Sequence, residues 1–457
     1  MQRMSGLDAS FYLIEDENTP LHVAAVIVME GPAPSYGDLV RLVAAKLPGM
    51  ERYRQRVRSV PLHAGRPGWV DDPHFQILYH VRHTAVPAPG GPDQLRNLAG
   101  RVVAQRLDPK KPLWELYLVE GLEGGAWAII GKVHHCMVDG VAGMDLITSL
   151  FELTPDAPLP APEHAWRPRP SPSGLALLAD AFVDNALQPL RAARSLPGDL
   201  LGTVRRAPQI VDYAGGLARQ LSRFTRASAS VLNGPIGPHR RWYWADATLD
   251  DVRAIRKAHG GTVNDIVLAA VTGGFRAQLA GRGALTPDRV VRSAVPVSVR
   301  TEAERGIPTN RVSSVFVNLP VGDPDPVARL AYLRAQMDDL KSTRQEQGGA
   351  RLTRLTDTAV APALLALGAR TPIRLFNPIV QTVTTNIPGP QFPLYILGSR
   401  VRAMYPYVPL TGGIQIATAI FSYAGRLHFG VCADFDGQPD SAVLAEGIED
   451  AIRELLP

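Results

Sequence analysis

The 457-residue chain contains only two cysteines, Cys136 and Cys432. Two cysteines cannot form the multi-bridge framework of a small disulfide-stabilised secreted protein, and such a low number suits a reducing compartment. No run of about 20 apolar residues occurs, so the sequence offers no transmembrane helix. Four of the first 20 residues are acidic, where a signal peptide would have its apolar core, so we expect no secretory leader.

A dense basic patch is also missing. The net charge is only +5, the pI is near 9.2, and no nucleic-acid-reading motif accompanies the arginines, so we expect no nucleic-acid partner. The small basic excess suits an anionic membrane surface or an anionic substrate. With 46% hydrophobic and 20% charged residues, the chain is typical of a folded globular protein that is long enough for two to three domains.

The most concentrated group of reactive side chains is in residues 134–140, which read HHCMVDG. Histidine is the side chain best suited to move a proton near neutral pH. Residues 127–133 are apolar and branched like a buried strand, and residues 141–153 have apolar side chains at helical spacing. We therefore expect His134 and His135 at a strand-to-helix junction together with Asp139, and Gly140 would let the helix approach the histidine loop closely.

The motif alone leaves other interpretations open. Most histidines are surface or structural residues. On the motif alone, a structural role for His134 and His135 is only slightly less favoured than a catalytic role. A metal site is disfavoured because adjacent side chains on a strand point to opposite faces, and no HExxH or paired CxxC motif is present; we expect no metal. A nucleophilic thiol at Cys136 is disfavoured because the nucleophile and the base of cysteine enzymes usually come from separate segments. We interpret Cys136 as a packing residue.

Composition divides the chain into three sections. Residues 1–153 and 240–457 both mix strand and helix patterns, and residues 154–239 form a connector. The connector begins with a proline-rich stretch that can continue neither a helix nor a central strand. Two helical segments with arginines opposite an apolar side follow, at 175–195 and 203–229. Such helices either lie on anionic lipid or pack on a neighbouring domain. Because the two outer sections have similar α/β patterns, we expect two domains of one fold with a cleft between them.

Hydrophobic periodicity predicts the main elements. Strands are expected at 22–30, 113–120, 126–133, 290–295, 313–319, 414–423 and 427–434, a turn at 123–125, and helices at 36–47, 249–259 and 263–279. The strand that begins at residue 290 is expected to end before Pro296, because proline donates no ladder hydrogen bond.

Further motifs occur in a fixed order along the chain. They are Leu7–Phe11 (LDASF), Pro112–Glu115 (PLWE), Leu232–Ile236 (LNGPI), Asn264–Asp265 (ND) and Asn386–Pro390 (NIPGP). Together with HHxxxDG they resemble the bacterial wax ester synthase/diacylglycerol acyltransferase family, especially its mycobacterial-type triacylglycerol synthases. HHxxxDG by itself is typical of the whole CoA-dependent acyltransferase superfamily. The resemblance implies two acyltransferase-like α/β domains, a helical connector, and an active-site tunnel at the domain interface.

The resemblance also implies roles for individual residues. His135 would be the general base that takes a hydroxyl proton from the acceptor and returns a proton to the CoA sulfur, without an acyl-enzyme, and His134 would support it. The aspartate that matches Asp139 pairs with an arginine in the superfamily instead of orienting the base. Arg54 and Arg56 are the candidate partners in this chain.

Other motif residues are candidates for binding. Asn264 is the best candidate for a polar group that faces the base across the interface, although Thr262 or Asn264 could equally cap the following helix. The weaker polar candidates are Thr384, Thr385, Asn386 and Ser422. In the PLWE motif, Pro112, Leu113 and Trp114 would either line the acyl channel or pack the domain core.

The implied activity is transfer of a long-chain fatty acyl group from acyl-CoA to diacylglycerol, which makes triacylglycerol. Wax ester synthesis on a long-chain alcohol is the alternative. A non-catalytic lipid-surface protein and a carrier-linked amide synthase are less favoured, because the HHxxxDG residues are intact and no carrier domain adjoins. Acyl-CoA is then a substrate, and no cofactor is expected. Because these substrates partition into lipid, we expect a cytoplasmic protein that associates peripherally with the inner membrane or lipid droplets.

Overall fold

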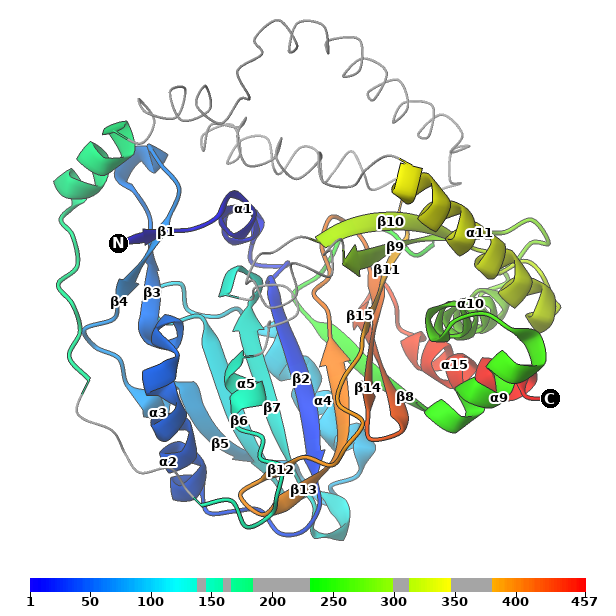
Figure 1. Ribbon diagram of the computed structural model, residues 1–457, viewed down its shortest axis with the longest axis horizontal. Helices are drawn as coiled ribbons and strands as arrows, with labels where there is room; N and C mark the ends of the chain where they lie inside the picture. The colour runs from blue at the N-terminus through cyan, green and yellow to red at the C-terminus, as the bar shows by residue number, and fades with distance from the viewer. Residues whose placement is uncertain (138–144, 159–165, 184–230, 299–311, 347–379) are drawn as a thin grey trace, which may run out of the picture.

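A computed structural model describes residues 1–137, 145–158, 166–183, 231–298, 312–346 and 380–457 of the protein. Two six-stranded mixed sheets lie next to each other, and helices flank them (Figure 1). A third, three-stranded sheet of β1 (Gln2–Arg3), β4 (Gly68–Asp71) and β3 (Gln55–Arg58) lies beside the first large sheet. The expected mixed α/β fold with sheets flanked by helices is confirmed.

The first large sheet comes mostly from the N-terminal section. Its order is β12–β13–β2–β7–β6–β5, with β5 and β6 parallel and the other neighbours antiparallel. The bounds are Tyr395–Ile396 (β12), Ser399–Tyr407 (β13), His22–Met29 (β2), Trp127–His134 (β7), Trp114–Glu120 (β6) and Val81–Ala85 (β5). The strands expected at 22–30, 113–120 and 126–133 are thus confirmed to within one residue at each end.

Side chains of this sheet alternate between two buried faces. In β2, Ile27 packs on one face with α2 (Tyr36–Lys46) and α5 (Asp145–Ser149), whereas Val26 packs on the other face with α4 (Pro92–Ala104). A strand that is covered on both faces needs apolar residues at successive positions, which explains the continuous apolar run in β2.

The second large sheet comes from the C-terminal section. Its order is β10–β9–β11–β14–β15–β8, and the strands adjoining β11 are parallel to it. The bounds are Val312–Leu319 (β10), Val291–Ser298 (β9), Thr382–Ile387 (β11), Ile416–Tyr423 (β14), Arg426–Asp434 (β15) and Arg240–Thr248 (β8). The helices on its outer side are α9 (Leu249–His259), α10 (Val263–Gly281), α11 (Pro326–Glu346) and α15 (Ser441–Leu455) (Figure 1).

The expected end of β9 before Pro296 is wrong. The strand continues to Ser298, and Pro296 lies opposite Ser314 of β10. On its other side, the pairing of β9 with β11 among the described residues covers Ser293 and Ala294, so Pro296 lies past it. Proline has no backbone N–H to donate, and this is tolerated at a position that needs no ladder hydrogen bond on that side.

The two large sheets share a core through an aromatic layer. Trp244 of β8 stacks on Tyr405 of β13 with ring centroids 4.4 Å apart, and Trp242 lies edge-on to Tyr407 at 5.2 Å. Strand β15 passes β13 so closely at Gly430 that an added Cβ would lie 1.8 Å from a backbone carbonyl oxygen of β13. Only glycine fits at this crossing, so the contact fixes how the sheets lie against each other.

Strands β12 and β13 cross from the C-terminal section into the first sheet. Met404 of β13, for example, lies opposite Ile27 of β2 in an antiparallel pair. This exchange ties the C-terminal section to the N-terminal sheet by main-chain hydrogen bonds. The division of the chain into domains at residues 153 and 239 stays a proposal. With that division, β12 and β13 would belong to the second domain by sequence and to the sheet of the first domain by pairing.

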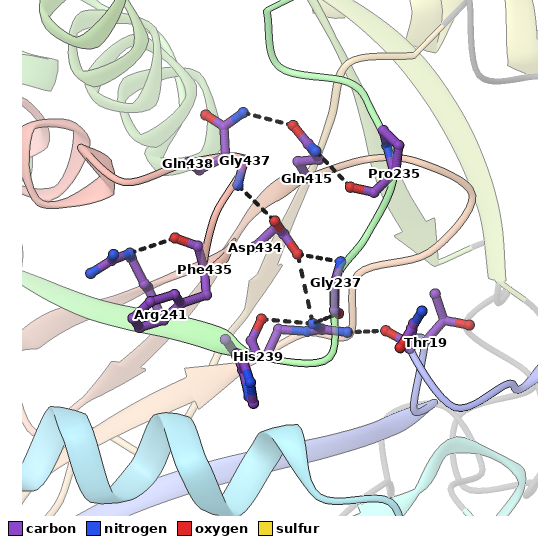
Figure 2. Close-up of polar contacts among 12 residues, drawn as sticks. Thr19, Pro235, Gly237, His239, Arg241, Gln415, Asp434, Phe435, Gly437 and Gln438 are labelled. Carbon is purple, nitrogen blue, oxygen red and sulfur yellow. Dashed lines mark hydrogen bonds and ion pairs between the residues drawn. The ribbon is translucent and has the colours of Figure 1, made fainter.

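Buried polar side chains fasten the end of the connector, residues 231–239 (Figure 2). Gln415 donates to a carbonyl of the LNGPI segment at 2.7 Å, and Asp434 accepts the Gly237 N–H at 2.7 Å. The fully buried side chain of Arg240 donates to two carbonyls of this segment and to the Asn18 carbonyl. Since Asn18 and Asp434 belong to different sections, this cluster joins both to the connector.

The connector helices expected at 175–195 and 203–229 lie mostly outside the described residues. Within the described part, residues 174–183 are helical. None of the described helices combines the length and the hydrophobicity that crossing a membrane requires.

Candidate active site

The two histidines lie where β7 ends. His134 is the last residue of the strand and is fully buried, and His135 begins a short 3-10 turn, His135–Met137. The His134 N–H donates to the Leu113 carbonyl at 2.9 Å, and the His135 N–H donates to the Leu21 carbonyl at 2.8 Å. Backbone from two other segments therefore holds both residues, and one of these segments is the PLWE motif.

Helix α1 (Gly6–Ile14), which carries the LDASF motif, lies against this turn. The helix begins at Ser5, whose hydroxyl accepts the Asp8 N–H at 3.1 Å and donates to the Asp8 carboxylate at 2.6 Å. Three residues further on, the Phe11 ring covers the His135 ring with centroids 4.1 Å apart. The sequence motif marked α1 without giving Phe11 a role, because a contact between residues so far apart leaves no local pattern.

Burial keeps the His135 ring neutral. It lowers the pKa of His135 to about 4. Nδ1 of the ring is buried and has no hydrogen-bond partner among the described residues. A histidine that is neutral at physiological pH has one ring nitrogen with a free lone pair, so it can accept a proton.

His134 has a different environment. Its Nδ1 accepts the Cys136 N–H at 3.1 Å, and its Nε2 lies 3.5 Å from a carboxylate oxygen of Glu15. Burial raises the pKa of Glu15, but His134 and Arg106 outweigh burial and hold it below its ordinary value. Sequence reasoning missed Glu15, because it was noted only as one of the acidic residues near the N-terminus.

Cys136 is buried in an apolar cluster with Met4, Ala9 and Leu113. Burial first, and then the charges of Asp8 and Glu15, raise the pKa of its thiol well above the ordinary value. A thiol that stays protonated is a poor nucleophile. This environment agrees with the interpretation of Cys136 as a packing residue.

Asp139 and Gly140 lie outside the described residues, so their expected roles stay predictions. Of the two arginines expected near Asp139, Arg54 is buried with its guanidinium 5.0 Å from the centre of the Trp166 ring. Arg56 is part of β3, opposite Val70.

The PLWE motif packs the core beside the histidines. Trp114 is 1% exposed, its indole N–H donates to the Tyr53 carbonyl at 2.7 Å, and its ring stacks on His80 at 4.6 Å. Leu113 is also buried, and Pro112 accepts the Trp114 N–H at 2.9 Å. These contacts are those of packing residues, and the alternative role in the acyl channel stays a prediction.

Two of the expected polar residues meet at the start of α10. Thr262 caps this helix in a reciprocal pair with Asp265, so Asn264 is not the cap. The Asn264 carbonyl oxygen accepts a hydrogen bond from the Asn386 amide at 3.4 Å. With its oxygen engaged, the NH₂ group of Asn264 is the part left to donate.

Thr384 and Ser422 have structural partners. Thr384 is 1% exposed and accepts a hydrogen bond from the Ser293 hydroxyl at 2.9 Å. Ser422 accepts the Gly389 N–H and the Gln391 amide, each at 3.1 Å, and so shapes the NIPGP turn. Their expected contact with substrate stays a prediction.

Two family models match the chain. The wax ester synthase/diacylglycerol acyltransferase catalytic domain matches residues 4–267, and the C-terminal domain of the same family matches residues 309–456. The chain belongs to the wax ester synthase/diacylglycerol acyltransferase family. The resemblance deduced from the ordered motifs is thereby confirmed.

Individual relatives are similar to the chain over its whole length. The "Probable diacyglycerol O-acyltransferase tgs1" of Mycobacterium tuberculosis H37Rv is 36% identical over 100% of this chain and 96% of its own length. The corresponding tgs2 protein is 31% identical over 100% of this chain and 99% of its own length.

Solved structures show the same fold. The wax ester synthase/diacylglycerol acyltransferase from Marinobacter aquaeolei VT8 superposes with a TM-score of 0.70 at 24% identity, covering 100% of this chain and 98% of that one. The TRI3 trichothecene 15-O-acetyltransferase from Fusarium sporotrichioides gives 0.65 at 14% identity, covering 100% and 95%. The expected two-domain acyltransferase fold is confirmed, and the interface tunnel stays a prediction.

Proposed function

We propose that this chain transfers a long-chain fatty acyl group from acyl-CoA to the hydroxyl of diacylglycerol, with His135 as the general base. As a member of its family, the chain is an acyl-CoA-dependent O-acyltransferase. The observation that carries the role of His135 is its ring, which burial keeps neutral at the end of β7 against the Phe11 ring. A neutral imidazole is the group that an alcohol needs in order to attack a thioester.

The chemistry requires two proton transfers. The neutral imidazole of His135 takes the proton of the acceptor hydroxyl as the oxygen attacks the thioester carbonyl carbon. The tetrahedral intermediate then expels the CoA sulfur, which receives the proton from the imidazolium, while the carbon–oxygen bond of the ester remains. The base returns to its neutral form, and no acyl-enzyme is formed.

The intermediate carries an oxyanion that a hydrogen-bond donor must stabilise. Asn264 is our candidate, because Asn386 engages its oxygen and leaves its amide hydrogens to donate. Pre-oriented donors of this kind contribute about 3 kcal/mol each in acyl-transfer enzymes. Asn264→Ala should therefore lower kcat by about 100-fold.

The acceptor and the place of action belong to the same proposal. Diacylglycerol is favoured because the relatives at 36% and 31% identity carry that acceptor in their names, and a long-chain alcohol is the alternative. Both substrates reside in lipid, so we propose that the protein works at the surface of the inner membrane or of lipid droplets, without spanning it. Failure to sediment with anionic liposomes would contradict this part.

The test is an acyl-transfer assay with labelled palmitoyl-CoA on the wild type and on His135→Ala. Diacylglycerol and hexadecanol are offered separately, and the labelled products are resolved. We expect triacylglycerol from the wild type, less wax ester, and neither product from the variant. Equal product from both proteins would refute the role of His135. An excess of wax ester over triacylglycerol would show that a long-chain alcohol is the preferred acceptor.

A further inference from the structure

Glu15 is a buried carboxylate next to the histidine pair. It follows directly on α1, its side chain is 3% exposed, and one oxygen accepts the Arg106 guanidinium N–H at 2.7 Å. Its other oxygen accepts the Leu21 N–H at 3.1 Å and lies 3.5 Å from Nε2 of His134. A buried charge is costly unless it is paired, and Arg106 supplies the pair.

Two routes lead from this carboxylate to the backbone of His135. The first runs through Leu21, whose N–H donates to Glu15 and whose carbonyl accepts the His135 N–H at 2.8 Å. The second runs through His134, whose Nδ1 accepts the Cys136 N–H at 3.1 Å. Glu15 thus contacts the residue just before the turn, His134, and the segment whose carbonyl accepts the His135 N–H, at Leu21.

The second route depends on the tautomer of His134. A ring whose Nδ1 accepts a hydrogen bond must carry its proton on Nε2. The Glu15 carboxylate lies on the Nε2 side of the ring. At 3.5 Å the attraction is electrostatic, since the distance is too long for a well-formed hydrogen bond. If the proton moved to Nδ1, it would face the Cys136 N–H and the turn would lose its acceptor.

We propose that Glu15, anchored by Arg106, is a positioning residue for the acyl transfer: it fixes the tautomer of His134 and the Leu21 backbone, and through both it sets the turn that presents His135. This inference rests on the proposed function, because it assumes that His135 is the base. Glu15 touches neither the reacting atoms nor the His135 ring, so it acts only through the geometry of the turn.

Glu15→Gln tests the proposal. The amide keeps the size of the side chain and an acceptor for Leu21, but it loses the charge that faces His134 and Arg106. We expect kcat to fall by about 10- to 100-fold, the range known for carboxylates that orient metal-binding histidines, with KM for acyl-CoA changing less than about twofold. The matched control is Asp440→Asn, another carboxylate held by an arginine, Arg282, at 2.7 Å, but in the helices of the second sheet. The control should keep wild-type kcat.

Nitrogen-15 NMR of histidine-labelled wild-type protein tests the same proposal if Glu15→Gln fails to fold. The His134 signals, assigned with His134→Asn, should show a protonated Nε2 and an unprotonated Nδ1. A protonated Nδ1 would refute the proposal. Unchanged kcat in a folded Glu15→Gln variant, alongside an inactive His135→Ala variant, would refute it and leave the proposed function standing. Product formation by His135→Ala would instead refute the proposed function.

Discussion

The pKa of His135 makes a sharp prediction about the pH dependence of the reaction. Burial lowers this pKa to about 4, from an ordinary histidine value near 6.5. A base must be neutral to accept a proton, so activity should be present above the folded pKa and be lost as the pH falls through it. With a pKa of about 4, roughly 97% of the base is neutral at pH 5.5, whereas an ordinary histidine would be only about 9% neutral.

The assay is kcat/KM for the acceptor between pH 7 and pH 5.5, at saturating acyl-CoA because the CoA phosphates also ionise in this range. We expect a change of less than about twofold, whereas an unshifted base would cost about tenfold. A roughly tenfold fall in a folded protein would refute the argument from burial.

Stability must be followed in the same samples. Burial also lowers the pKa of His80 to about 4. As the pH falls below about 6.5, His80 therefore takes up its proton in the unfolded chain before it does so in the folded protein. The stability that comes from burying neutral His80 is complete above that pH and is lost as the pH falls to about 4. The loss is on the order of 3 kcal/mol for such a histidine. Circular dichroism at each pH separates unfolding from titration of the base.

Three further predictions concern stability, measured by chemical denaturation. Gly430→Ala should destabilise the fold by about 3 kcal/mol or more, because the new Cβ would lie 1.8 Å from a carbonyl oxygen of β13. The control is Gly281→Ala, whose new Cβ would have no atom within 4 Å and should change the free energy of unfolding by less than about 0.5 kcal/mol. Equal effects would contradict the close crossing of the sheets. Arg240→Met should cost about 3 kcal/mol because Asp434 stays buried without its cation, and a cost below about 1 kcal/mol would show that the cluster is dispensable. Trp114→Phe should cost about 1–3 kcal/mol through the lost indole hydrogen bond, and an unchanged midpoint would count against its core role.

Local patterns predicted most of the strands and helices. The helix expected at 249–259 has these bounds in the structure, and the strand expected at 427–434 begins one residue earlier. These elements bury one or both faces, and a buried face imposes a period of two or 3.6 that is visible in the sequence. The end of β9 was wrong because the effect of a proline depends on whether a second strand lies beside it, which periodicity does not contain.

The sequence also placed the chain in its family, since the ordered motifs depend on residue identity at many positions. For the site it predicted His135 at the end of a strand and grouped Asn264 with Asn386 as polar candidates. It left two interpretations open for Trp114, and the observed contacts are those of a core residue.

By itself, the sequence determined the class of fold, the place of the histidine pair and the family, because short-range patterns and residue identities carry that information. Only the tertiary structure decided which side chains surround the pair. Phe11 and Glu15 reach the histidines from more than 100 residues away, and β13 joins the sheet of a strand more than 350 residues earlier. The pKa of His135 also follows from burial, and burial exists only once these distant segments have packed together.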